Sequence, residues 1–267
     1  MDKNLIIDVG VHTGEDTEFY LKKGFRVIGI EANPDIYEGT KKRLDAYIQT
    51  GQLILLNFAI SSQNQPVTFY INLDRSIWST TSLDFVSRND FLGTRSTATT
   101  VEGRKFENIL QEFGIPYYLK VDIEGADLLC LQALQSFGTK PQFLSIESTQ
   151  TSWNDLLAEL TLLKELGYKK FKAINQKDVP KQVCPFPAKE GEYIKHRFEY
   201  GSSGLFGEET PGNWLSETEV IKVYKRIFLQ YRLLGANGFF NQFSLGKMVL
   251  NELQLKLPWY DTHARLI

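Results

Sequence analysis

Cysteine and histidine are scarce in this chain of 267 residues, and their scarcity limits the chemistry that it can carry. The two cysteines, Cys130 and Cys184, exclude a disulfide scaffold and are too few for a four-cysteine zinc site. Only three histidines are available as bases near neutral pH, namely His12, His196 and His263.

Long apolar runs and an excess of one charge are also missing. No stretch approaches the roughly 20 apolar residues of a membrane span, and the first residues carry no signal-peptide core. The formal net charge of −2 disfavours a general electrostatic grip on nucleic acid or anionic lipid. We therefore expect a cytoplasmic protein that binds neither nucleic acid nor a membrane.

The composition is that of a globular protein. Hydrophobic residues make up 42% of the chain and charged residues 23%, which argues against disorder. Aromatic residues reach 13%, a somewhat high share that favours a thick core or aromatic-lined pockets. A chain of this length fits one large domain, or one domain with an elaboration.

Short apolar runs alternate with helical patterns over the first 174 residues, which predicts a parallel α/β sheet. The expected strands are 5–9, 26–31, 53–60, 67–71, 118–123, 143–147 and 168–174. The expected helices are 15–23, 34–50, 105–113, 125–137 and 152–166. Residues 76–100 are dense in Ser, Thr, Arg and Asp and are expected to form a long loop.

The amino-acid composition changes at residue 175. Four of the nine prolines lie in residues 175–215, which predicts loop wrapped over a surface. A strand is expected at 193–200, helices at 216–234 and 243–255, and an aromatic tail at 258–264 that packs on the mouth of the core. We expect a cofactor-binding α/β core over 1–174, and a last strand with a C-terminal cap over 175–267, within one globular unit.

The turn after the first strand favours a cofactor without phosphates. Its glycines, Gly10 and Gly14, lack the Gly-x-Gly-x-x-Gly spacing of dinucleotide enzymes. His12 takes the place of the second glycine, where the backbone must touch a pyrophosphate. Glu15 and Asp16 put carboxylates at the helix start, the end that would otherwise attract phosphate. S-adenosylmethionine, with a sulfonium, an ammonium and one carboxylate, fits this turn.

Glu31 is placed to bind a ribose. It ends the second expected strand, 21 residues after Gly10, where an acidic side chain can accept both ribose hydroxyls. NAD and S-adenosylmethionine share that requirement, so Glu31 alone does not discriminate between them.

A second motif ends the strand at 118–123. Residues 120–127 read Lys-Val-Asp-Ile-Glu-Gly-Ala-Asp, and Gly125 lets the chain turn into the next helix. Together with the Asp-x-Gly-x-x-x-Gly turn that begins at Asp8, this stretch resembles the FkbM family of S-adenosylmethionine-dependent methyltransferases. The resemblance spans roughly residues 5–174.

The resemblance implies a class I methyltransferase core, which is a Rossmann-like, doubly wound, seven-stranded and mostly parallel sheet, here followed by a C-terminal loop-and-helix cap. It also implies methyl transfer from S-adenosylmethionine, commonly to a hydroxyl oxygen, on a small molecule or glycan. The residues expected to bind the cofactor are Asp8, Gly10, His12, Thr13, Gly14, Glu31, Ala32, Asn33, Ala59 and Asp122.

Catalysis of methyl transfer asks mostly for alignment and for removal of the acceptor's proton. Asp122 and Glu147 end adjacent strands and should point into the crevice; Asp122 is assigned to cofactor contact, and Glu147 to a base or to a divalent metal site. His12 and His263 are further candidate bases. Glu124 and Asp127 can serve as acids at the N-terminus of the next helix as readily as they can bind a ligand.

Two other functions stay open. A nicotinamide-dependent oxidoreductase can use a similar sheet, although His12 and the acidic helix start disfavour it. A non-catalytic Rossmann-like binding module is the other alternative, although Asp8, Gly10 and Glu31 are all present.

Overall fold

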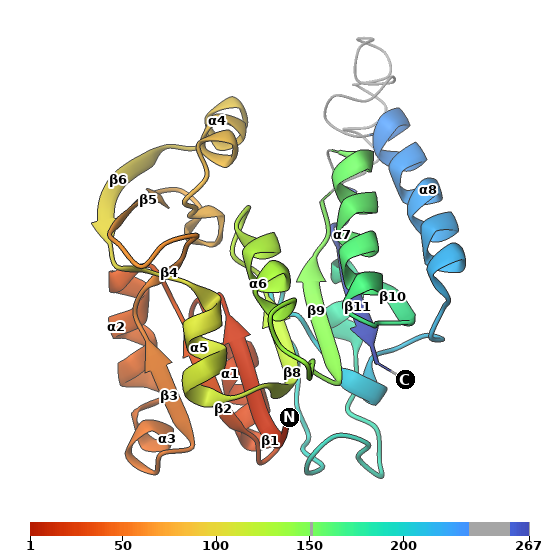
Figure 1. Cartoon of the computed structure of the whole chain (residues 1–267), viewed down its shortest axis with the longest axis horizontal. Helices are drawn as coiled ribbons and strands as arrows, with labels where there is room; N and C mark the ends of the chain where they lie inside the picture. Colours follow the sequence, from red (N-terminus) through yellow and green to blue (C-terminus); the bar gives the residue numbers. More distant parts are fainter. Residues whose placement is uncertain (150–151, 235–256, 267) are drawn as a thin grey trace.

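The computed structural model describes residues 1–149, 152–234 and 257–266. Its centre is a seven-stranded sheet with the strand order β10-β11-β9-β8-β1-β2-β3 (Figure 1). Six strands run parallel, and β11 is antiparallel to both of its neighbours. The strands are β1 (Asp2–Val9), β2 (Arg26–Ile30), β3 (Leu53–Leu56), β8 (Pro116–Val121), β9 (Phe143–Glu147), β10 (Lys170–Asn175) and β11 (Tyr260–Arg265). The expected seven-stranded, mostly parallel sheet is confirmed.

Helices cover both faces of this sheet. The first face carries α5 (Phe106–Phe113), α6 (Asp127–Leu134), α7 (Trp153–Glu165) and α8 (Glu217–Leu234). The second face carries α1 (Glu15–Lys22), α2 (Pro34–Arg43) and α3 (Asp45–Gln49). None of the described helices is long and apolar enough to cross a bilayer.

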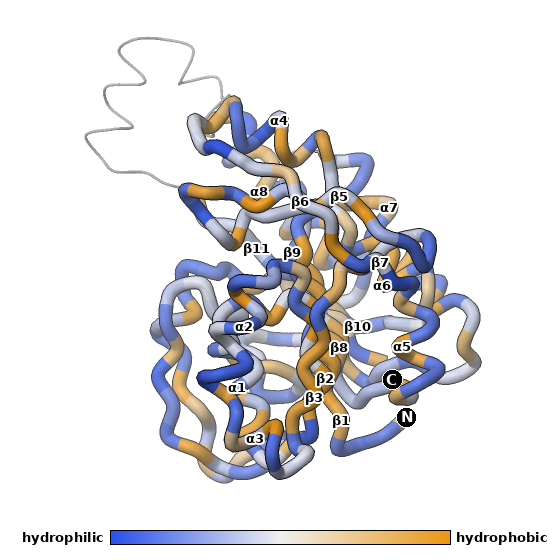
Figure 2. Tube along the Cα trace, turned by 90° about the vertical axis from the view of Figure 1, so that its left-hand side faces the viewer, coloured by the Kyte–Doolittle hydropathy of each residue, from blue (hydrophilic) through white to orange (hydrophobic). Residues whose placement is uncertain are grey.

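Strand alternation decides which side chains enter each core. Leu5, Ile7 and Val9 pack on the first face, whereas Ile6 packs on the second. By the same alternation Asp8 and Lys120 lie on the second face, beneath α1. Figure 2 shows that the most hydrophobic residues follow one another along β1, β2, β3 and β8, as expected for strands covered on both sides.

The third expected strand is interrupted. β3 ends at Leu56, and the chain resumes as β4 (Ala59–Ile60), which pairs with β7 (Gly103–Arg104) outside the main sheet. The break lies at Asn57, whose side-chain amide donates to the carbonyl of Glu31 at 2.8 Å. This bond ties the end of β3 to the end of β2.

The prediction of a long loop at 76–100 is wrong. Residues 61–102, here called the insertion, form an antiparallel pair of strands, β5 (Val67–Asn72) and β6 (Ser96–Val101), joined by the 3-10 turn η1 (Ser76–Trp78) and by α4 (Leu83–Phe91). The β5 strand was expected. β6 is rich in threonine, and a polar strand paired with one neighbour looks like loop in composition.

The C-terminal third holds two further differences from expectation. Residues 193–200 form no strand; Phe198 instead packs edge-on against Phe19 of α1, with ring centroids 4.8 Å apart. The tail does reach the core, but as strand β11, which inserts between β9 and β10. The helix expected at 216–234 is α8, and the helix expected at 243–255 lies outside the described residues.

Candidate active site

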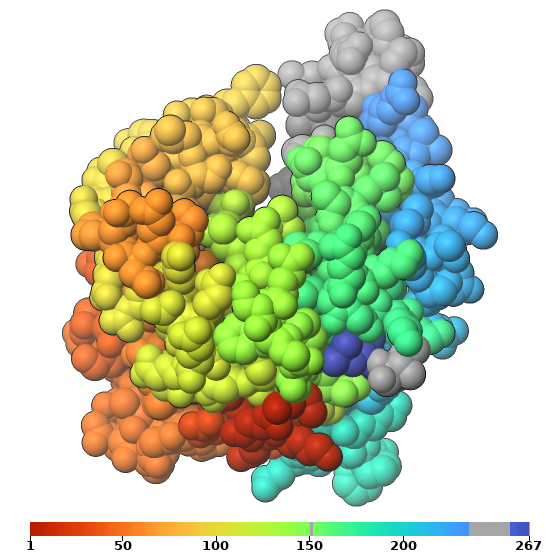
Figure 3. All heavy atoms as spheres, viewed as in Figure 1, coloured from red at the N-terminus to blue at the C-terminus, as the bar shows by residue number. Residues whose placement is uncertain are grey.

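The parallel strands end along one edge of the sheet, here called the carboxyl edge, and the insertion stands beside it. In Figure 3 a groove separates the gold atoms of the insertion from the green atoms of α7. In open α/β sheets ligands bind at this edge, where the strand order reverses. Here the reversal falls between β1 and β8.

The turn after β1 is pressed against the end of β8. Gly10 has a φ of +90°, and a Cβ at this position would lie 1.9 Å from the carbonyl oxygen of Asp122. Only glycine allows both this backbone conformation and this approach. Gly14, which precedes α1, packs less tightly: a Cβ there would lie 2.9 Å from the methyl group of Thr40 in α2.

Glu31 joins the first turn to the start of α2. Its two carboxylate oxygens accept from the backbone N–H groups of His12 and Asn33, each at 2.8 Å. The side chain of Asn33 caps α2. Ala32 lies between Glu31 and Asn33 in the sequence. Burial raises the pKa of Glu31. Each carboxylate oxygen keeps a second lone pair, so the pre-positioned group can still accept hydroxyl hydrogens.

The side chain of His12 links this turn to the insertion. Its Nε2 lies 2.8 Å from Oγ of Ser76 in η1, and its Nδ1 lies 3.1 Å from the hydroxyl of Thr13. Thr13 itself is exposed and donates to Glu15. Burial, the largest effect, lowers the pKa of His12 and so favours the neutral ring.

Asp8 lies beneath the turn. Its side chain is fully buried; one oxygen accepts from the hydroxyl of Thr17 at 2.6 Å and the other from Nζ of Lys120 at 3.2 Å. These bonds join β1 to α1 and to β8 directly beneath the turn.

Lys120 is the buried cation of the carboxyl edge. Its ammonium donates to the carbonyl of Gly10 at 3.0 Å and lies 3.8 Å from carboxylate oxygens of both Asp16 and Asp122. Although burial alone would lower the pKa of Lys120, the surrounding carboxylates raise it. Lys120 belongs to the sequence motif, but the sequence alone did not indicate its role. The signal that could have identified a buried cation is one charged residue inside an otherwise apolar strand.

Asp16 connects this network to the C-terminal segment. Both of its oxygens accept from the backbone N–H of Ser203 at 3.0 Å. Burial raises the pKa of Asp16 to about 6. A residue expected only to mark an acidic helix start thus holds the loop at 201–204 against α1.

Asp122 is a partly exposed acid of the motif. It follows β8, its N–H donates to the carbonyl of Val9, and 42% of its side chain is accessible. It lies beside the first turn and is free to contact a ligand.

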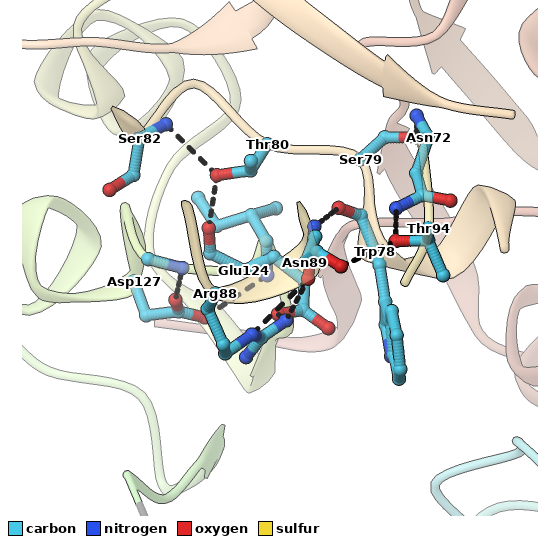
Figure 4. Close-up of polar contacts among 12 residues, drawn as sticks. Asn72, Trp78, Ser79, Thr80, Ser82, Arg88, Asn89, Thr94, Glu124 and Asp127 are labelled. Atoms are coloured by element: carbon cyan, nitrogen blue, oxygen red, sulfur yellow. Dashed lines mark hydrogen bonds and ion pairs between the residues drawn. The ribbon is translucent and has the colours of Figure 1, made fainter. Parts of the chain in front are cut away.

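Glu124 and Asp127 have structural partners. Asp127 accepts from the N–H groups of Ile123 and Gly125, each at 3.0 Å, and so braces the loop. Glu124 forms an ion pair with Arg88 of α4 at 3.0 Å, and its carbonyl accepts from the hydroxyl of Thr80 (Figure 4). Burial raises the pKa of Glu124 to about 7, against the opposing effect of Arg88. The pair anchors the insertion to the carboxyl edge.

Glu147 ends β9 as expected, and Asp261 of β11 lies directly opposite it. Burial and the neighbouring carboxylates Glu124 and Asp122 raise the pKa of Glu147 well above its ordinary value. Sequence reasoning missed Asp261, because the tail gave no strand signal.

The structure does not bring His263 to the carboxyl edge. It lies in the middle of β11, in register between Ser145 of β9 and Lys172 of β10, and is 2% exposed. Burial lowers its pKa to about 3, which makes it a weak base. His196 packs against Phe19, with ring centroids 4.9 Å apart.

The remaining expected residue, Ala59, is buried in β4, and its N–H donates to the carbonyl of Glu102. Within the described part of the chain, no three His, Cys, Asp or Glu side chains are grouped as metal ligands. The carboxylates near the edge outnumber the cations Lys120 and Arg88, which suits a positively charged ligand.

Comparison with known proteins identifies a family. The model of the methyltransferase FkbM domain matches residues 8–170, which is more than half of the chain. None of the curated proteins matches the chain.

Solved structures give weaker similarities. The FkbM methyltransferase from Methylobacillus flagellatus is 17% identical with a TM-score of 0.42, and the match covers 65% of this chain but only 40% of that one. The precorrin-6y C5,15-methyltransferase from Geobacter metallireducens is 9% identical with a TM-score of 0.41, covering 100% and 82%. The phosphoethanolamine N-methyltransferase 2 from Haemonchus contortus, in complex with S-adenosyl-L-methionine, is 11% identical with a TM-score of 0.38, covering 99% and 49%. Because these TM-scores are low, the assignment to a family rests on the domain match.

Proposed function

The chain belongs to the FkbM methyltransferase family, and from this premise we propose that it transfers a methyl group from S-adenosylmethionine to a hydroxyl oxygen of a small molecule or glycan. The observation that carries the proposal is the arrangement of Glu31, Gly10 and Asp122 around the reversal of strand order.

The residues of the carboxyl edge fit this cofactor. Glu31 would hold the ribose hydroxyls through its unused lone pairs, and the exposed carboxylate of Asp122 would hold the ammonium. The turn of Gly10, His12 and Gly14 would lie against the nucleoside. When bound, S-adenosylmethionine supplies a methyl group activated by its positive sulfur.

The same edge disfavours a dinucleotide. Glu15 and the buried Asp16 place negative charge in the first turn of α1, where a pyrophosphate would need backbone N–H groups and no carboxylates. These features support a cofactor with cationic groups.

The acceptor's proton needs a nearby base. Glu147 lies at the edge with a raised pKa, so that it is a stronger base than an ordinary carboxylate. The hydroxyl of an acceptor bound between Asp122 and the insertion would lie near the carboxyl group of Glu147. The net charge of −2 supports an acceptor other than nucleic acid.

Calorimetric titration with S-adenosylhomocysteine and with NAD tests the cofactor. We expect the first to bind and the second not to bind. Glu31→Gln should weaken binding about tenfold or more, since about 1.4 kcal/mol of ribose contact is lost. The matched control Glu38→Gln changes an exposed carboxylate on α2 and should leave the affinity unchanged. Binding of NAD alone would favour the oxidoreductase.

A panel of hydroxylated small molecules and glycans tests the reaction. The expected result is formation of S-adenosylhomocysteine with at least one acceptor and a new O-methyl signal in its mass spectrum. Cofactor binding without turnover on any acceptor would favour a non-catalytic module.

A further inference from the structure

Two carboxyl groups at the carboxyl edge lie on neighbouring strands without a partner. Glu147 is the last residue of β9, and Asp261 is its register partner in β11. Within the described part of the chain, neither side chain makes a hydrogen bond or an ion pair. Asp261 is nevertheless only 8% exposed. A buried carboxylate is normally paired, so the lack of a partner for Asp261 calls for an explanation such as a shared proton.

The ladder between β9 and β11 brings these two side chains close together. The N–H of Ser148 donates to the carbonyl of Tyr260 at 3.1 Å, so residues 148 and 260 form a hydrogen-bonded pair. Pairs alternate along an antiparallel ladder, which makes Glu147 and Asp261 a non-hydrogen-bonded pair. Side chains approach most closely in such pairs, with Cβ atoms about 4.5–5.5 Å apart on the same face.

The surroundings of the pair are mainly acidic. The titratable groups that face Asp261 are Asp122, Lys120, Asp16 and Glu159. Those that face Glu147 are Glu124, Asp122, Asp261, Asp127 and Tyr231. The one cation among them, Lys120, is already engaged by Asp8 and Gly10. Two adjacent carboxyl groups in such a place cannot both be ionised at low cost.

We propose that Asp261 is a further catalytic residue, which shares one proton with Glu147 so that the ionised member of the pair accepts the proton of the acceptor hydroxyl. This inference rests on the proposed function. As the O–H bond breaks, its proton goes to the ionised carboxylate and its electron pair forms the new bond from oxygen to the methyl carbon. The bond from carbon to sulfur breaks, and its electrons neutralise the sulfonium.

The arrangement gives each member a task. The ionised carboxylate is the base, and the protonated partner donates a hydrogen bond that keeps the base oriented. Burial, with the adjacent acids, raises the pKa of both groups above that of an ordinary carboxyl. The pair is therefore a better proton acceptor near neutral pH than a single exposed carboxylate.

Carbon-13 NMR of labelled carboxyl groups tests proton sharing on the enzyme alone. Asp261→Asn removes one negative neighbour, so the pKa of Glu147 should fall by about one pH unit or more. Glu147→Gln should lower the pKa of Asp261 in the same way. The control is Glu38→Gln, an exposed carboxyl on α2 that acts on neither member of the pair, which should leave both pKa values unchanged. Independent titration of Glu147 and Asp261 would overturn proton sharing.

Turnover tests the catalytic role with an acceptor from the hydroxylated panel. Asp261→Asn should lower kcat about a hundredfold or more, the range of a lost general base, and should leave the Kd for S-adenosylhomocysteine unchanged. Glu38→Gln should keep both values. Full turnover by Asp261→Asn would refute the proposal.

The outcomes separate this inference from the function on which it rests. If the wild-type protein fails to bind S-adenosylhomocysteine, the proposed function is wrong. If it binds the cofactor and methylates an acceptor while Glu147 and Asp261 titrate independently, only the inference is wrong.

Discussion

Lys120 shows how a single residue organises the carboxyl edge. Its side chain is 5% exposed, and its ammonium contacts groups from β1, α1 and the end of β8. Buried charges are tolerated when they are paired and hydrogen-bonded. The lysine thus lets Asp8, Asp16 and Asp122 lie close together without destabilising the fold.

Lys120→Met tests this role through stability. Removing the cation leaves Asp8 and Asp16 buried without compensation, so the free energy of unfolding should fall by about 3–5 kcal/mol. Chemical denaturation measures the loss. As a control, Lys22→Met breaks the exposed pair with Glu18 and should change stability by at most about 1 kcal/mol. Equal stability of Lys120→Met and the wild type would contradict the assignment.

Arg88 helps to hold the insertion to residues 122–127 at the carboxyl edge. Its guanidinium pairs with Glu124 and stacks 4.3 Å from the ring centroid of Phe85. Phe85 in turn packs over Gly125, where a Cβ would lie 2.8 Å from its ring. Movement of α4 and the conformation of residues 122–127 are therefore linked.

Arg88→Met should loosen α4 without unfolding the sheet. Without its cation, the pKa of Glu124 should rise further above 7, and amide hydrogens of α4 should exchange faster than in the wild type. Hydrogen exchange followed by mass spectrometry measures this change. Arg95→Met, which breaks an exposed pair with Asp74 in the same insertion, is the control and should leave α4 protected.

The elements differ in how far the sequence could predict them. The parallel strands were predictable because each is a short apolar run bounded by a turn, and Gly10 and Glu31 were predictable because the turn requires them. β11 was not, since Asp261, Thr262 and His263 are polar residues that become buried only between two other strands. Lys120 and Asp16 were not recognised as a network because burial, not spacing, brings them together.

Across the whole molecule, buried acids and a buried histidine set opposite pH dependences. Burial raises the pKa of Glu124 to about 7 and of Glu159 to about 8, so the folded state holds their protons more tightly than the unfolded state. Their stabilising effect is complete below pH 4.5 and is lost as the pH rises through those values. The lowered pKa of His263, about 3, acts the other way and stabilises above pH 6.5.

Between pH 6.5 and about 8 the two acids should make stability decline; His263 has no further effect there, and the lowered pKa of Lys172, about 8, opposes the decline only towards the upper end. Denaturation midpoints over this range measure the decline. Glu159→Gln should reduce it and should raise the free energy of unfolding at pH 9 by about 1 kcal/mol or more, because no buried charge forms. At pH 4 the variant and the wild type should be nearly equal. A steeper decline in the variant would contradict this explanation.

The position of β11 has a consequence for how the enzyme comes into being. During synthesis on the ribosome, β9 and β10 emerge long before residues 260–265 and must leave a gap between them for the final strand. Until residues 260–265 have been made, β10 has no strand to pair with in the main sheet, and Glu147 lacks its register partner Asp261. The sheet of seven strands can therefore close only after these residues have left the ribosome.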